Sequence, residues 1–132
     1  ERVATLVGLA TAELLNDGAA RDGDRIDDDD VALAWSRTMW HSPDEVVHYC
    51  PPLNREPGGW RVWGGQDGVY SHDSSVCMAA VHAGLITFEG GGTIEVTRQP
   101  GLDEYVGSTR NGVTTLDWGS WHASYTLARH EP

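Results

Sequence analysis

The hydrophobic pattern of the chain singles out one short segment that is apolar on nearly every side. Between Asp73 and Gly84 the residues are mostly small or apolar, and no polar face recurs at helical spacing. Asp73 or Ser74 can cap the start of a helix, and Gly84 suits the position after its last turn. Because a helix that is apolar all round is usually buried, the pattern predicts a central helix over about 74–84, wrapped by strands.

Short runs of strand-forming residues surround this predicted helix. They are expected at 61–63, 68–70, 93–97, 113–116 and 121–127. Asp67-Gly68 and Asn111-Gly112 are turn signals between such runs. Residues 41–52 contain Pro51-Pro52, which disfavours regular pairing, and are expected to be a connector. Several short strands around one helix predict the α+β class.

The N-terminal third has a helical pattern of its own. Apolar residues over 2–16 recur at i, i+3 and i+4, and a second helix is marked by Val31, Ala34, Trp35 and Met39. We therefore expect a helical extension over 1–46, built as helix, acidic loop and helix, followed by a second domain over 47–132.

The acidic loop has the outline of an EF-hand, in which loop oxygens coordinate Ca²⁺. The candidate ligands are Asp22, Asp24, Asp27 and Asp30. The first, third and fifth loop positions would fall on Ala19, Arg21 and Gly23, so three expected ligands are absent. The alternative is a solvated first helical turn over 27–30, favoured by the helix dipole. No other cofactor is expected.

The charge of the chain excludes some partners. The net charge is −11, and all nine basic residues are arginine. This balance argues against nucleic acid, whose phosphates need cationic clusters, and against simple docking on anionic lipid. No apolar run is long enough for a transmembrane helix. The apolar stretch 3–15 is interrupted by Glu13 and lacks a basic front, so it is not expected to be a signal peptide.

The predicted helix and its flanks also carry an ordered set of motif residues. They are Tyr70, Ser74, Ser75, Cys77, Ala80, His82, Gly84, Gly91, Tyr105, Asn111 and Gly112. In this order they resemble the signature of the LCCL domain, a small extracellular module, over roughly 47–129. The resemblance implies a central helix enclosed by two antiparallel sheets and an extracytoplasmic location, periplasmic or secreted. It does not fix an activity.

The cysteine pattern departs from that family. LCCL domains usually have four cysteines in two bridges, whereas this chain has Cys50 and Cys77, and Asn54 stands where a further family cysteine would be. The two could pair and close a loop worth about 3.5 kcal/mol in the chain-entropy model. Alternatively, both are buried free thiols. The bridge is favoured because the resemblance implies an extracellular protein.

No catalytic constellation is evident in the sequence. Five residues of helix turn Cys77 and His82 about 140° apart, so they cannot form a nucleophile–base pair. His82 is expected to be a core histidine whose ring N–H bonds a backbone carbonyl. His48 and Cys50 have the spacing of a pair of zinc ligands, but the signal is weak because no second pair with ligand spacing lies nearby. The chain is not expected to be an enzyme.

The six tryptophans offer the remaining candidate chemistry. Most tryptophans belong to a core or an interface, but exposed ones can stack on sugars. The candidate ligand-binding residues are Trp60, Trp63, Trp118 and Trp121. The predicted function is a non-enzymatic extracytoplasmic recognition module for glycans or cell-surface components. The alternative is a structural or assembly subunit that makes protein–protein contacts within a larger complex.

Overall fold

A computed structural model describes residues 28–40, 46–53 and 58–130. Two helices and six strands occur there: α2 (Asp28–Ser36), β2 (Val47–Cys50), β3 (Tyr70–Ser71), α3 (Val76–His82), β4 (Gly92–Pro100), β5 (Thr109–Arg110), β6 (Val113–Thr114) and β7 (Ala123–Arg129). The α+β class is as predicted. The predicted helix over 2–16 lies outside the described residues. Within the described ranges, no helix is long and apolar enough to span a membrane.

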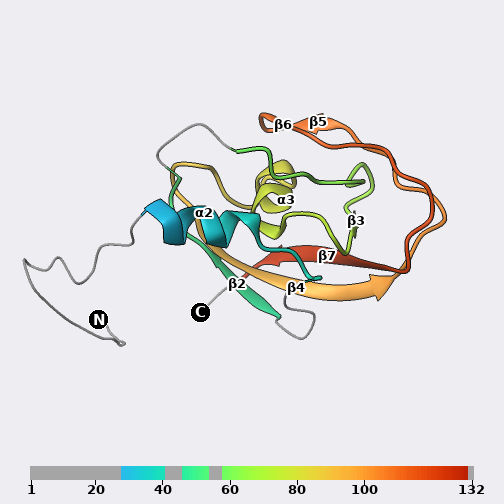
Figure 1. Cartoon of the computed structure of the whole chain (residues 1–132), viewed down its shortest axis with the longest axis horizontal. Helices are drawn as coiled ribbons and strands as arrows, with labels where there is room; N and C mark the ends of the chain where they lie inside the picture. The colour runs from blue at the N-terminus through green and yellow to red at the C-terminus, as the bar shows by residue number, and fades with distance from the viewer. Residues whose placement is uncertain (1–27, 41–45, 54–57, 131–132) are drawn as a thin grey trace, which may run out of the picture. The chain divides into compact units, whose positions relative to one another are not determined.

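The strands form two antiparallel sheets. The larger has the order β2-β4-β7-β3, and its longest pairing joins β4 to β7. The smaller is the hairpin β5-β6, which turns at Asn111 and Gly112, with φ of 53° and 82°. Positive φ at both central residues is the signature of a tight hairpin turn, which explains the Asn-Gly pair. In Figure 1, α3 lies between the hairpin and the larger sheet.

Helix α3 is buried as the hydrophobic pattern predicts. All seven of its residues are buried, and Gly84 follows it with φ of 81°. The predicted cap was one or two residues too early, because the N-cap is Ser75. Its hydroxyl accepts from the Met78 N–H and donates to the Trp35 carbonyl at 2.7 Å. Ser75 therefore both begins α3 and joins it to α2.

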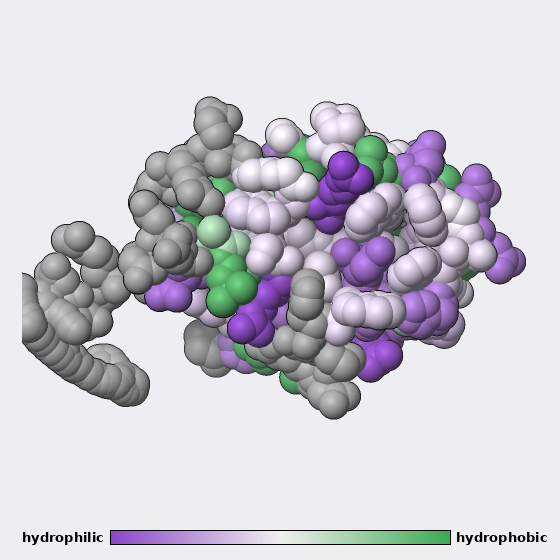
Figure 2. Space-filling view, viewed as in Figure 1, coloured by the Kyte–Doolittle hydropathy of each residue, from purple (hydrophilic) through white to green (hydrophobic). Residues whose placement is uncertain are grey.

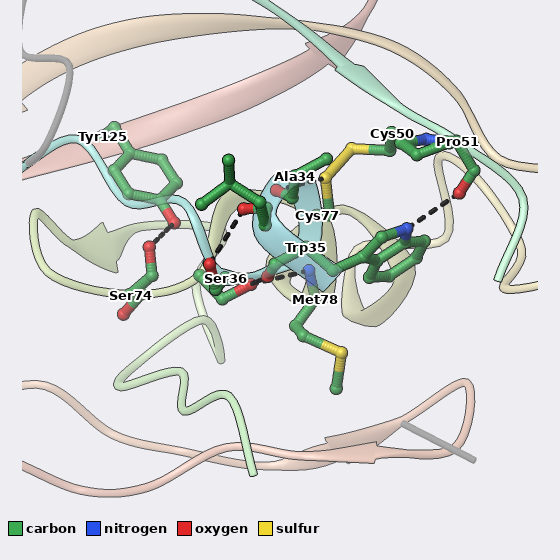
Figure 3. Close-up of a disulfide and its surroundings, with 11 residues drawn as sticks. Ala34, Trp35, Ser36, Cys50, Pro51, Ser74, Cys77, Met78 and Tyr125 are labelled. Carbon is green, nitrogen blue, oxygen red and sulfur yellow. Dashed lines mark hydrogen bonds between the residues drawn. A yellow bond between two sulfur atoms is a disulfide. The ribbon is translucent and has the colours of Figure 1, made fainter. Parts of the chain in front are cut away.

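The core is centred on Trp35 and the cysteine bridge. Trp35 is fully buried, stacks on Phe88 at 5.7 Å, and donates its indole N–H to the Pro51 carbonyl at 2.7 Å. Cys50 and Cys77 form a disulfide with their Cα atoms 5.7 Å apart. Figure 3 shows the indole beside the bridge, directed at Pro51. The structure thus contains the bridge and not two free thiols.

Residues 31–40 pack into this same core, through Trp35 and Met39. The predicted division between an extension over 1–46 and a domain over 47–132 stays a prediction. Residues 41–52 were expected to be a connector, but 47–50 form strand β2, with Val47 paired to Glu95 of β4. His48 and Cys50 point inward, whereas Val47 and Tyr49 are exposed. The prolines follow the strand instead of interrupting it.

Candidate functional site

A buried chain of polar side chains connects β3, α3 and the hairpin. The Tyr70 hydroxyl lies 2.9 Å from His82 Nδ1, and His82 Nε2 lies 3.0 Å from the Ser108 hydroxyl. Burial raises the pKa of Tyr70 to about 12, so its hydroxyl keeps its proton at neutral pH. The tautomer of His82 decides which ring nitrogen donates, because each of the two hydroxyls can either donate or accept.

The His82 ring is fully buried and links these elements. Burial, followed by the charge of Arg110, lowers the pKa of His82, which keeps the ring neutral at neutral pH, while a hydrogen bond with the Ser108 backbone opposes the shift. The ring was expected to bond a backbone carbonyl. The structure adds two side-chain hydroxyls as partners of its nitrogens. The network holds the core together.

The tryptophans pair across the fold and not with their sequence neighbours. The ring contacts join Trp35 to Trp60, Trp63 to Trp118, and Trp40 to Trp121, each at 6.4 Å between centroids. Of the four predicted ligand-binding residues, Trp60 packs against the core, and Trp63 lies under the exposed Trp118. Trp121 instead meets Trp40. The predicted four are therefore distributed over three places.

The contact between Trp40 and Trp121 forms a corner built on backbone hydrogen bonds. Thr38 pairs with Ser75 in an isolated β-bridge, and the Trp40 N–H donates to the Thr38 hydroxyl at 3.1 Å. Met39, between them, is fully buried. The segment is thus anchored by Met39 while the Trp40 side chain stays 58% exposed.

The other two sides of the corner come from the ends of paired strands. The His72 N–H, just after β3, donates to the Ala123 carbonyl at the start of β7. This places His72 beside His122, with ring centroids 5.6 Å apart. Trp121 precedes that strand, and its own N–H donates to the Leu102 carbonyl. Segments from three distant parts of the sequence therefore meet here.

The corner encloses a cavity of about 280 Å³ lined by Thr38, Trp40, Asp73 and Trp121. The planes of the two indoles are inclined by 43°. The Trp40 ring meets the edges of His72 and His122 at 5.9 and 5.8 Å. Asp73 accepts a 2.6 Å hydrogen bond from the Ser71 hydroxyl, which fixes its carboxylate at the rim. The cavity is thus an aromatic site with one anchored acidic group.

Several polar atoms beneath this corner lack ordinary partners. The Trp121 indole N–H and both ring nitrogens of His72 are buried without a hydrogen bond among the described residues. Burial, then the charges of Arg98 and His122, lowers the pKa of His72, while Asp73 and the Met39 backbone oppose the shift. Each unpaired buried polar group costs about 1–3 kcal/mol. Such a cost is found at functional sites more than in a core optimised for stability.

The metal predictions find little support in the described part of the chain. Asp22, Asp24 and Asp27 lie outside the described residues, and Asp30 is exposed on α2. Cys50 is oxidised in the bridge, so it is no thiolate ligand beside His48. Among the described residues, no group of three or more His, Cys, Asp or Glu side chains could hold a metal ion. Ca²⁺ binding by the acidic loop stays a prediction.

Comparison with known proteins fixes the family. The family model described as LCCL domain matches residues 28–125, which include both helices and the bridge. The chain belongs to the LCCL domain family. This match begins at α2, so the helix that supplies Trp35 falls within it.

Curated relatives agree with this assignment. Vitrin from Bos taurus is 38% identical over 88 residues, which are 67% of this chain and 13% of that protein. Human cysteine-rich secretory protein LCCL domain-containing 2 is 40% identical over 73 residues, 54% of this chain and 14% of its own length. Cochlin from Cavia porcellus is 38% identical over 61 residues, which are 46% of this chain and 11% of that protein. This chain thus spans about an eighth of the relatives it matches.

Sequence reasoning missed most of the corner. Trp40, His72 and His122 are not among the candidate binding residues that the sequence offers, and Asp73 is expected there only as a helix cap. A local signal exists only at 121–122, where an aromatic residue and a histidine come directly before strand β7. Nothing in the sequence places Trp40 beside it.

Proposed function

We propose that this LCCL domain is a non-enzymatic extracytoplasmic recognition module that binds glycans or other cell-surface components. The observation that supports it best is the cavity between Trp40 and Trp121. Ligand sites are typically concave and mostly apolar, with a few fixed polar groups. Two indoles and the anchored carboxylate of Asp73 have this composition.

The location outside the cytoplasm is supported by two observations. The domain contains the Cys50–Cys77 disulfide, and such bonds persist mainly in oxidising compartments. A relative carries the word "secretory" in its name. The non-enzymatic part of the proposal is supported by the full burial of His82 between two hydroxyls, which keeps this ring away from a substrate.

Glycan-array binding with matched variants tests the proposal. The wild type is expected to give a reproducible set of hits that Trp40→Ala reduces about fivefold to tenfold, because about 1–1.4 kcal/mol of aromatic contact is lost. Trp118→Ala is the control, since that side chain is 51% exposed but lies away from the cavity. No hits, or equal hits for the wild type and Trp40→Ala, would contradict the proposal.

A second candidate is a structural role through protein–protein contact, supported by strand β2. It lies at the edge of the described sheet and exposes Val47 and Tyr49, with Val46 before it. Edge strands with exposed apolar side chains can pair with another chain. On the face seen in Figure 2, hydrophobic residues form small separate groups among polar ones, so that face adds little to this candidate. Sedimentation equilibrium of the wild type and Val47→Lys would show whether β2 mediates association.

A further inference from the structure

We propose that the cavity between Trp40 and Trp121 binds a quaternary ammonium group, with the Asp73 carboxylate as its counter-charge. This inference rests on the proposed recognition function and names the chemical group that the site selects. The shared chemistry is a trimethylammonium head, as in choline, whether it is carried by a surface polymer or by a lipid.

The walls of the cavity suit a small cation. Indole faces carry the negative part of the ring quadrupole, and tryptophan is the strongest aromatic partner for a cation. Trp40 and Trp121 contribute two such rings, 6.4 Å apart and inclined by 43°. Two inclined rings that line one small cavity can both contact a single rounded group.

The charges around the cavity favour a positive ligand. Among the described residues that line it, Asp73 is the one ionisable group, and its carboxylate is held by the Ser71 hydroxyl. Arg98 influences His72 but is not one of these lining residues. The net charge of −11 adds a long-range attraction for cations. A neutral ligand could accept or donate hydrogen bonds here but would gain no charge–charge attraction.

His72, below Trp40, does not oppose this charge at neutral pH. Burial lowers the pKa of His72, so its ring is neutral there. The groups that face this ring are His122, Arg98 and Asp73, together with the Met39 backbone. Acidification that protonates His72 would introduce positive charge next to the cavity and weaken the binding of a cation.

The size and polarity of the cavity exclude two other cations. A metal ion needs several oxygen, nitrogen or sulfur ligands, but among the described residues of the lining Asp73 is the only carboxylate. A primary ammonium is more strongly hydrated, so it loses more on transfer to a site walled by two indoles. A volume of about 280 Å³ is at the small end for ligand sites, which matches one compact head group.

Titration of the whole chain with choline, followed by tryptophan fluorescence and calorimetry, tests the inference. The neutral isostere 3,3-dimethyl-1-butanol has the same shape without the charge. Choline is expected to bind about tenfold more tightly than the isostere, the factor that a cation–π and carboxylate contribution implies. Equal affinities, or no saturable signal with choline into the tens of millimolar, would overturn the inference.

Variants locate the site. Trp40→Ala and Asp73→Asn are each expected to weaken choline binding about fivefold to tenfold, whereas Trp118→Ala is expected to leave it unchanged. Asp73→Asn should weaken choline more than the isostere, an effect that general unfolding would not produce. Circular dichroism verifies that each variant is folded. Unchanged choline affinity in both cavity variants would overturn the assignment.

Carriers distinguish the source of the group and separate this inference from the proposed function. Phosphocholine-conjugated dextran and phosphatidylcholine vesicles present the same head group on a polymer and on a lipid. The carrier that binds the wild type but not Trp40→Ala identifies the source of the group. Glycan hits that depend on Trp40, without choline binding, would leave the recognition function standing and refute the quaternary ammonium ligand. Choline binding without glycan hits would support the inference and restrict the recognition function to cell-surface components that carry this group.

Discussion

Buried tryptophan and histidine side chains have hydrogen-bond partners around α3, whereas at the corner near Trp40 such partners are missing among the described residues. Around α3, the buried polar side chains have partners: His82 lies between two hydroxyls, and Trp35 donates to Pro51. At the corner, the buried Trp121 indole N–H and the His72 ring nitrogens have no hydrogen-bond partner within the part of the chain that the structure describes, and Trp40 is mostly exposed. Satisfied groups stabilise a fold, whereas unsatisfied groups beside an open aromatic cavity cost stability. The comparison separates the part that holds the domain together from the part available for binding.

The largest expected contrast is between two tryptophans five residues apart. Trp35→Ala should lower the free energy of unfolding by about 3–5 kcal/mol, because it empties a fully buried site and leaves the Pro51 carbonyl without its donor. Trp40→Ala should change it by less than about 0.5 kcal/mol, since the side chain is mostly exposed. Urea unfolding followed by circular dichroism measures both. Similar losses in the two variants would mean that the corner is as structural as the core.

Removal of the disulfide should destabilise the core around α3 and leave the corner able to bind its ligand. Cys50→Ala with Cys77→Ala should lose about 3.5 kcal/mol, the loop constraint for 27 residues of separation. Reductant should lower the melting temperature of the wild type and leave the double variant unchanged. Choline binding at the corner should survive in the folded double variant. Two alkylatable thiols in the denatured, non-reduced wild type would show that the bridge is absent.

A smaller effect links the buried histidines of the two regions to pH. Burial lowers the pKa of both His72 and His82 below the ordinary 6.5. As pH falls through 6.5, the unfolded chain takes up protons that the folded chain resists, so stability is present above that value and declines below it. Urea midpoints at about pH 7.5 and about pH 5.5 should show this decline. His72→Gln and His82→Gln should each reduce it.

Stability that rises on acidification would contradict this assignment of the two histidines. A decline that only His82→Gln reduces would place the linkage in the core alone. It would also indicate that the ring of His72 is accessible to protons in the folded state, which would sharpen the difference between the two regions.

The sequence by itself determined the features that depend on local pattern. The apolar run before Gly84 specified a buried helix, because no face of it suits water. Asn111-Gly112 specified a tight turn, because only such residues adopt positive φ at both positions without strain. The ordered motif residues specified the family. The first two signals lie within a few neighbouring residues. The third is a set of residues whose order and spacing along the chain can be read without the structure.

The tertiary structure alone decided where distant residues meet. Trp40 and Trp121 are 81 residues apart, and their contact depends on the Thr38–Ser75 bridge and on the pairing of β3 with β7. β2 became a strand because β4 offers it hydrogen-bonding partners, which the composition of 47–50 does not reveal. The ring of His82 likewise contacts the hydroxyls of Tyr70 and Ser108, which come from other parts of the chain. Burial and partners are properties of the packed chain, so the core could be predicted from local pattern and the binding corner could not.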